Sequence, residues 1–282
     1  MSTFRVTLPR NEHDIADSLA RIVAGGGEPV VIGGGTLTVP ALARGDIDAP
    51  EVVDLGRTGL NGLVVENGSL HLGALVCYQQ LLESAEVRLR FPLLHRLCAG
   101  ITGGVQIRNQ GTIIGALCAA RPQSDIPAAL VALAAEVVVK STAGTRTVSA
   151  SAFLHDAEKT GLAPTEFVSA VRISTQPGRS GYVKVKASES SWPVVTAAAI
   201  VPGRVVLGGV SRIPHRIPLT ENMFDSNYDG VRAAVTDQLD RLPVAQRWSD
   251  LRADWTYRRR IAPEVAVRAV RTALERRDTD CE

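Results

Sequence analysis

The amino-acid sequence predicts an α+β protein with two domains, on three observations. Apolar runs of strand length alternate with helical patterns in the first part of the chain. A segment rich in glycine and polar residues, Thr175 to Gly181, is typical of a linker. Several apolar strands follow this linker and two helices come after them, which is typical of a separate α+β unit. We therefore expect one domain over residues 1–176 and a second over residues 177–282.

The composition narrows the classes of function. The 282 residues are 45% hydrophobic and 21% charged, which favours packed domains over disorder. The net charge of +2 gives no electrostatic preference for nucleic acid or for a membrane surface. Aromatic residues make up only 4%, which argues against a stacking platform for single-stranded nucleic acid. We therefore expect no nucleic-acid partner.

Targeting and metal-binding patterns are also missing from the sequence. Met1 to Arg5 lack the basic-then-apolar pattern of a signal peptide, and no uninterrupted apolar run could cross a bilayer. We therefore expect a cytoplasmic protein without membrane insertion. The four cysteines form no CxxC pair and the five histidines have no metal-ligand spacing. This predicts no disulfide framework, no metal site, and no iron–sulfur cluster held by this chain alone. The cysteines are Cys77, Cys98, Cys118 and Cys281.

The first part of the chain gives a clear series of elements. Asn11 is predicted to cap a helix with an apolar face, and Gly25 to Gly27 end it. Asp125 is predicted to cap a second helix that runs through Ala134, whereas Ile101 to Pro122 show little periodicity. Strands are expected at Pro29–Ile32, Glu51–Leu55, Leu70–Ala74 and Glu136–Lys140, and further helices at Tyr78–Glu83 and Phe91–Gly100.

Beyond the linker, the expected strands are Gly181–Lys186, Val194–Val201 and Arg204–Val210, and the expected helices are Tyr228–Arg241 and Pro263–Arg276. Arg258 to Arg260 form a run of three cations. Because the net charge is near neutral, we interpret this run as a solvated or interface patch.

The first motif that carries chemistry is a strand that ends in three glycines. Val30 to Ile32 form the strand, and Gly33, Gly34, Gly35, Thr36 and Leu37 follow it. Backbone N–H groups without a Cβ beside them can approach an anion such as a diphosphate, and Thr36 adds a hydroxyl donor. The spacing is neither the GxGxxG of a Rossmann site nor a P-loop. A tight turn between two elements is the alternative interpretation.

The second motif lies about 75 residues later. Gln106 to Ala116 contain two glycines and other small residues that could close on the same ligand, and Asp125 follows after Arg121-Pro122. Asp125 at a helix start could accept a hydrogen bond from a ribose hydroxyl or a ring nitrogen. The alternative is that Asp125 is only a helix cap and Arg108 only a surface charge.

Together these motifs resemble the FAD-binding medium subunit of molybdenum hydroxylases of the carbon monoxide dehydrogenase and xanthine dehydrogenase type. That family carries a Gly-Gly-(His/Thr) loop, then Gln-Ile-Arg-Asn-x-Gly-Thr-Ile-Gly-Gly-Asn, then Pro-x-x-Asp-x-Pro. The matching residues here are Gly34 to Thr36, Gln106 to Asn109, Gly111 to Ile113, and Pro122 to Pro127. Weaker matches are Leu72 to Ala74, Tyr182 to Lys186, Leu207 to Val210, and Tyr257 to Arg259.

The resemblance implies a fold and a set of site residues. The fold would be the two-subdomain FAD-binding fold of the vanillyl-alcohol oxidase/PCMH type, with the subdomains divided near residue 57. A smaller α+β domain of the carbon monoxide dehydrogenase flavoprotein type would follow. The residues carried over as FAD contacts are Val30, Val31, Ile32, Gly33, Gly34, Gly35, Thr36, Leu37, Thr102, Thr112, Ile113, Ile114, Gly115, Ala116, Asp125 and Lys184. Ile114 and Ala116 depart from the family pattern, because they replace a glycine and an asparagine.

The resemblance also implies a function and partners. FAD on this chain would accept electrons from two [2Fe–2S] clusters in a small subunit, while a large subunit holds the molybdenum cofactor and the substrate. The chain would then need no catalytic residue of its own, and the complex would be a dimer of heterotrimers. Two alternatives remain at this point: a stand-alone flavin-dependent oxidoreductase of the same fold, and a non-catalytic assembly subunit with weakened FAD binding.

Overall fold

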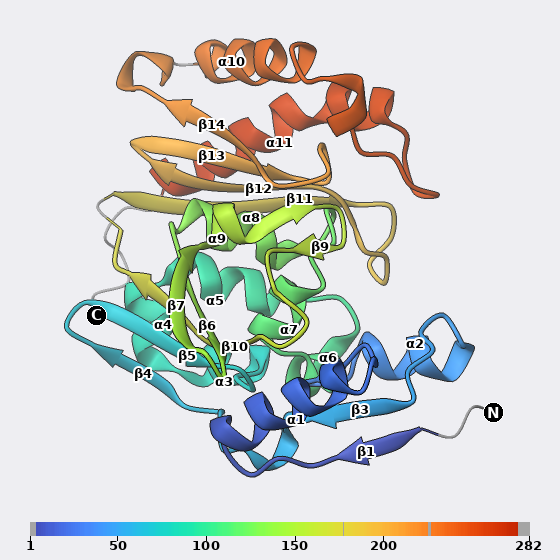
Figure 1. The fold of residues 1–282 in the computed structure, drawn as a ribbon. Helices are drawn as coiled ribbons and strands as arrows, with labels where there is room; N and C mark the ends of the chain where they lie inside the picture. Colours follow the sequence, from blue (N-terminus) through green and yellow to red (C-terminus); the bar gives the residue numbers. More distant parts are fainter. Residues whose placement is uncertain (1–3, 177, 225–226, 276–282) are drawn as a thin grey trace.

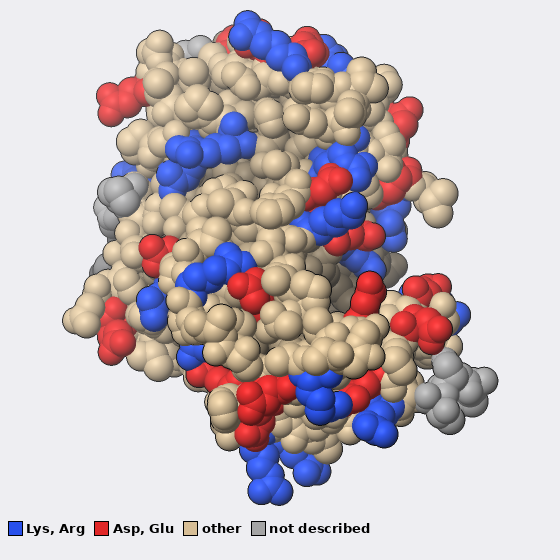
Figure 2. Space-filling model, in the orientation of Figure 1, with Lys and Arg blue, Asp and Glu red and all other residues tan. Residues whose placement is uncertain are grey.

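Three large sheets and their helices are stacked along the long direction of the molecule (Figure 1). The computed structural model describes residues 4–176, 178–224 and 227–275. Within these residues, no helix is both long enough and apolar enough to cross a membrane. On the face shown in Figure 2, basic and acidic side chains are interspersed, as the small net charge predicts.

The N-terminal sheet is parallel and has the order β1-β3-β2. Helix α1 (Glu12–Ala24) begins as predicted, because the Asn11 side chain accepts a hydrogen bond of 2.9 Å from the Asp14 N–H. Its apolar face is buried and packs between β3 and β6 of the next sheet. The strands are β1 (Arg5–Thr7), β2 (Val30–Ile32) and β3 (Glu51–Asp54); helix α2 (Thr38–Arg44) lies between β2 and β3 in sequence.

The middle sheet is antiparallel throughout and has the order β4-β5-β10-β6-β7. Its strands are β4 (Leu63–Glu66), β5 (Ser69–Gly73), β6 (Glu136–Ser141), β7 (Gly144–Ser149) and β10 (Phe167–Ser174). A short two-stranded sheet adds β8 (Leu154–Asp156) and β9 (Lys159–Thr160).

A group of short helices accompanies the middle sheet (Figure 1). They are α3 (Tyr78–Glu83), α4 (Ala85–Arg90), α5 (Pro92–Ala99), α6 (Gly104–Gln110), α7 (Ile113–Cys118), α8 (Asp125–Ala132) and α9 (Ala150–Phe153). Every residue of α8 is buried, because other elements surround this helix on all sides.

The C-terminal sheet is antiparallel, in the order β11-β12-β13-β14. All nine residues of β12 are buried, because α11 packs on this strand and α8 of the preceding part also contacts it. The unbroken apolar run that predicted this strand therefore reflects burial on both faces. The elements are β11 (Arg179–Lys186), β12 (Pro193–Val201), β13 (Gly203–Gly208), β14 (His215–Leu219), α10 (Asp229–Asp240) and α11 (Trp255–Glu275).

Several expectations from the sequence need correction. Residues 101–122 contain the two short helices α6 and α7, which were not predicted because glycines interrupt the helical periodicity of this segment. Helix α11 begins at Trp255 rather than at Pro263, so the proline lies inside it. Pro263 has no backbone N–H and so cannot donate a helix hydrogen bond. Burial of the apolar face of α11 stabilises the helix by more than the loss of this one bond. Strand β11 begins at Arg179, within the segment that was expected to be a linker.

Two further corrections concern individual side chains. Ser124, not Asp125, is the N-cap residue of α8, and the Asp125 carboxylate has other partners. Arg258 is not part of a solvated patch, because its side chain is fully buried. Of the other two arginines in that run, Arg259 is half-buried and Arg260 is exposed. Cys281 lies outside the described residues, and the other three cysteines are free thiols.

The Glu51 side chain connects its own strand, β3, with β1 and with helix α1. These contacts predict how the stability of the protein depends on pH. Its carboxylate accepts hydrogen bonds from Arg21 of α1 and Thr7 of β1. The Arg21 hydrogen bond, followed by that of Thr7, lowers the pKa of Glu51 from 4.5 to about 2. The stabilisation is therefore present above pH 4.5 and is lost as the pH falls toward about 2. Because Arg21 is half exposed, we expect Glu51→Gln to cost no more than ~1 kcal/mol at neutral pH.

Urea denaturation at several pH values measures this difference. The gap between wild type and Glu51→Gln should close as the pH approaches 2. Glu66→Gln is the matched control, since Glu66 is exposed on β4 and forms no ion pair with a described residue. A gap that stays constant down to the lowest pH would show that the Glu51 carboxylate does not carry the effect.

Candidate functional site

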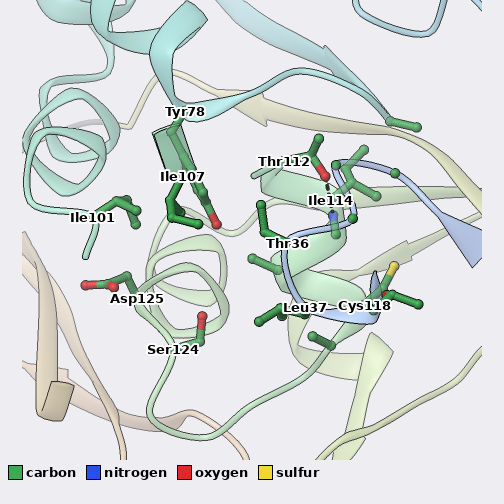
Figure 3. Close-up of a pocket in the computed structure, with 18 of the residues that line it drawn as sticks. Thr36, Leu37, Tyr78, Ile101, Ile107, Thr112, Ile114, Cys118, Ser124 and Asp125 are labelled. Atoms are coloured by element: carbon green, nitrogen blue, oxygen red, sulfur yellow. Dashed lines mark hydrogen bonds between the residues drawn. The ribbon is translucent and has the colours of Figure 1, made fainter. Parts of the chain in front are cut away.

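A cavity of about 530 Å³ lies where the three parts of the fold meet. Its volume is in the range of small-molecule and cofactor sites. Segments that are far apart in the sequence form its wall, and Figure 3 shows side chains from several of them around the cavity. They are the loop after β2, the starts of α3, α7 and α8, the segment 101–107, the segment 162–168, and the residues just before β12.

The first glycine loop forms one side of the cavity. Gly33 to Leu37 all line it, and Gly35 adopts a left-handed conformation with a φ of +70°. Gly34 lies directly against the second loop: a Cβ at this position would be 1.7 Å from the Gln110 carbonyl oxygen. The two backbones approach so closely that only glycine fits here.

Within the second glycine loop, Gln106 to Ala116, Thr112 is the N-cap residue of α7. The Thr112 Oγ1 accepts a hydrogen bond of 3.0 Å from the Gly115 N–H. A Cβ at Gly33 would be 3.3 Å from the same Oγ1, so this threonine also contacts the first loop. Thr112, Ile114, Gly115 and Ala116 line the cavity. The two loops that the sequence singled out therefore converge on one space.

The backbone of the first loop has free donors. Within the described chain, no hydrogen bond uses the N–H groups of Gly34, Gly35, Thr36 or Leu37. Backbone donors with limited exposure are almost always bonded, so these groups are available to a ligand or to water. Consecutive backbone N–H groups beside one cavity can form a binding site for an anionic group. Within the second loop, Gly115 leaves room for the Thr112 side chain, because a Cβ there would be 2.7 Å from Thr112 Oγ1.

Asp125 forms a polar corner at one end of the cavity. It is only 5% exposed, and its Oδ1 accepts hydrogen bonds from Lys184 Nζ, at 2.7 Å, and from the Tyr182 hydroxyl. Lys184 Nζ also donates to the Gly100 carbonyl oxygen at 2.6 Å. Burial, reinforced by the Asp125 charge, raises the pKa of Tyr182 well above its usual value, so the phenol stays protonated. Oδ2 of Asp125 accepts no hydrogen bond from a described residue and is available to a ligand.

The rest of the wall is mainly apolar. Leu55, Ile101, Ile107, Leu162, Phe167 and Trp192 contribute to it. Such surfaces suit the planar rings of a cofactor. Burial raises the pKa of the Cys118 thiol in this wall to about 12, so it is not a thiolate at neutral pH. Glu166 is also in the wall, and its hydrogen bond from Arg146 lowers the pKa of this carboxyl.

Most of the predicted site residues meet at this cavity. Val31, Gly33 to Leu37, Thr102, Thr112, Ile114, Gly115, Ala116 and Asp125 line it. Four others do not reach the wall: Val30 and Ile32 belong to β2, Ile113 is fully buried, and Lys184 acts through Asp125. Among the described residues, no group of three potential metal-ligating side chains is present.

Sequence reasoning missed several wall residues. Tyr78, Ile101 and Trp192 line the cavity without belonging to a matched motif. Ile107 and Ser124 lie within matched motifs but were not named as site residues. Tyr78 carried one usable signal, since it begins the helix that follows β5, four residues after Ala74 of the matched Leu72 to Ala74 segment. No sequence pattern indicated Trp192, because only the tertiary fold brings the end of the β11–β12 connection to the cavity.

A mostly apolar cavity with free amides between two glycine loops defines a dinucleotide-binding protein. Residues 2–175 match the family described as FAD binding domain in molybdopterin dehydrogenase. The chain belongs to this family. The predicted resemblance is therefore confirmed, and so are the FAD cofactor and the oxidoreductase class that it implied.

Curated relatives and solved structures agree with this assignment. The chain is 28% identical to the glyceraldehyde dehydrogenase medium chain of Sulfolobus acidocaldarius, over 84% of this chain and 88% of that one. It is 26% identical to the carbon monoxide dehydrogenase medium chain of Hydrogenophaga pseudoflava, over 95% and 98%.

The same fold occurs in two solved complexes. One chain of carbon monoxide dehydrogenase from Hydrogenophaga pseudoflava superposes with a TM-score of 0.86 at 24% identity, over 97% of this chain and 98% of that one. One chain of quinoline 2-oxidoreductase from Pseudomonas putida 86 gives a TM-score of 0.85 at 22% identity, over 96% and 97%. These matches confirm the mixed α and β fold of the PCMH type that the sequence predicted.

Proposed function

We propose that this chain is the FAD-binding subunit of a molybdenum-containing hydroxylase and that it carries electrons from [2Fe–2S] clusters to an external acceptor. The observation that carries the proposal is the convergence of the two glycine loops, with free amides, on a cavity of cofactor size. Relatives that match most of the chain are medium chains of dehydrogenases, which supports the same role.

The residues of the cavity fit FAD by their chemistry. The N–H groups of Gly34 to Leu37 and the Thr36 hydroxyl would bind the diphosphate. Asp125 would accept a hydrogen bond from a hydroxyl or ring N–H of the cofactor through Oδ2, while Lys184 and Tyr182 hold its other oxygen. Ile113, Val30 and Ile32 would support the loops from behind.

Bound FAD would supply the redox chemistry, and the protein would supply its position and its electrostatic surroundings. The apolar wall would exclude water from the rings. The Asp125–Lys184 pair brings one negative and one positive charge to the same corner, so it adds no net charge there. This chain would then need no general acid or base of its own.

We further propose the partners and the domain division. A large molybdopterin-binding subunit and a small [2Fe–2S] subunit would complete a heterotrimer, and two heterotrimers would form the assembly. The names of the relatives as medium chains or medium subunits support a multi-subunit complex. Residues 1–176 would be the FAD-binding domain, in two parts that divide near residue 57, and residues 177–282 the C-terminal domain. The three separate sheets support this division.

Co-expression with the genes that neighbour this one tests the electron-carrier role. We expect a yellow complex in which organic substrate, added without oxygen, bleaches the flavin band only when all three subunits are present. The isolated chain should be yellow but should not turn over substrate. Turnover by the isolated chain would favour the stand-alone oxidoreductase instead. A colourless chain that takes up no added FAD would favour the assembly subunit.

A further inference from the structure

Tyr78 lies at the point where the two glycine loops meet. It is the first residue of α3, and its N–H donates a hydrogen bond of 3.2 Å to the Gly111 carbonyl oxygen. The ring lies against the backbone of Gly111, because a Cβ there would be 2.7 Å from Tyr78 Cε2 and 3.3 Å from Cδ2. Gly111 in turn faces Gly34 of the first loop, whose Cβ would be 3.3 Å from the Gly111 Cα. The phenol is therefore fixed beside both loops.

The hydroxyl of Tyr78 has no hydrogen-bond partner among the described residues. The residue is only 7% exposed, yet its hydroxyl donates to no described residue. Figure 3 shows the oxygen pointing into the cavity, between Ile107 and Thr36. Polar side-chain groups with this degree of burial are nearly always hydrogen-bonded. An unpartnered phenol aimed into a ligand cavity therefore indicates a bond that forms with the ligand.

The electrostatic surroundings make this group a donor. Burial, reinforced by the negative charge of Asp125, raises the pKa of Tyr78 far above its usual value. The phenol stays protonated throughout the physiological range. It can then donate to an anion without a competing negative charge of its own. Ala116, on the same cavity wall, presents only a methyl group and offers no side-chain donor.

We propose that Tyr78 is an FAD-binding residue whose hydroxyl donates a hydrogen bond to the diphosphate of the cofactor. This inference rests on the proposed function, because it requires the diphosphate between the two glycine loops. It adds a side-chain donor from α3, outside the two loops. The position follows from the Gly111 contact, since Cε2, the ring carbon next to the one that bears the hydroxyl, lies against the second loop.

Calorimetric titration of the cofactor-free chain with FAD tests the inference. We expect Tyr78→Phe to raise the dissociation constant for FAD about 10- to 100-fold, as for the loss of a hydrogen bond to a charged group. Tyr257→Phe is the matched control, because Tyr257 lies on α11 away from this cavity and is 40% exposed. Its dissociation constant should equal that of the wild type.

Two further measurements distinguish binding from a structural role. The melting temperature of the cofactor-free Tyr78→Phe chain should not fall, since no protein hydrogen bond is lost. The phosphorus NMR signals of bound FAD should shift between wild type and variant. A lower melting temperature without FAD, or unchanged phosphorus signals beside weaker binding, would overturn the inference.

The outcomes also separate this inference from the proposed function. If the wild type binds FAD and Tyr78→Phe binds it equally well, the inference fails and the proposed function stands. If the wild type binds no FAD at all, both fail.

Discussion

Replacing Gly34 with alanine is expected to abolish FAD retention while the chain stays folded. The added Cβ would be 1.7 Å from the Gln110 carbonyl oxygen, and real contacts of this kind are not shorter than 3.0 Å. Both atoms belong to backbone or are fixed to it, so the two loops must separate by more than an ångström. Several hydrogen bonds to the diphosphate are then lost together. We expect the dissociation constant for FAD to rise at least about 100-fold.

The measurement is the ratio of flavin absorbance to protein absorbance after gel filtration, followed by calorimetric titration. Gly62→Ala is the matched control: no atom lies within 4 Å of the added Cβ and Gly62 does not have a left-handed φ. It should retain FAD like the wild type, and far-UV circular dichroism should show both variants folded. A Gly34→Ala chain that retains stoichiometric FAD would contradict the convergence of the two loops as the basis of binding.

Replacing Arg258 with methionine is expected to give the largest loss of stability. The side chain is fully buried and joins three backbone segments, since it donates to the carbonyl oxygens of Val194, Gly209 and Ala253. It also pairs with Asp250 Oδ1 at 2.6 Å. Methionine keeps much of the volume but removes the cation that pairs with the Asp250 carboxylate and donates to three carbonyl oxygens. Removal of one partner from a buried pair costs about 3–5 kcal/mol of the free energy of unfolding.

Urea denaturation of the cofactor-free chain measures this cost. Arg259→Met is the matched control at the next position of the same helix, because Arg259 is half exposed and pairs with Asp240 on the surface. We expect it to cost less than ~1 kcal/mol. Adding Asp250→Asn to Arg258→Met should restore part of the loss, because it removes the unpaired charge. Equal losses for the two arginines would show that Arg258 does not hold these segments together.

Where one local rule dominates, the sequence predicts the structure well. Asn11 caps α1 as expected, because the capping bond involves only neighbouring residues. The apolar run of β12 predicts a strand because both of its faces are covered. The glycine loops are recognisable because close backbone approach at Gly34 excludes every other residue. These features depend on residues that are near in sequence or on a single steric requirement.

Predictions from the sequence were wrong or incomplete where tertiary contacts decide. Gly103 and Gly104, with φ of +99° and +71°, interrupt the periodicity around α6, so that helix was not predicted. Strand β10, which was not predicted, joins the middle sheet between β5 and β6, which come from distant parts of the chain. Lys184 was predicted to contact FAD, and its ion pair with Asp125, which the sequence did not predict, arises only from the tertiary fold. Tyr78 reaches the cavity only because α3 packs against the second loop.

The central claim is that the two glycine loops enclose the diphosphate of FAD, and a crystal structure of the chain reconstituted with FAD tests it most directly. Diphosphate oxygens within hydrogen-bond distance of the Gly34 to Leu37 amides, and of the Tyr78 hydroxyl, are the expected result. Clear density for the diphosphate outside the space between Gly34 and Thr112 would contradict the account.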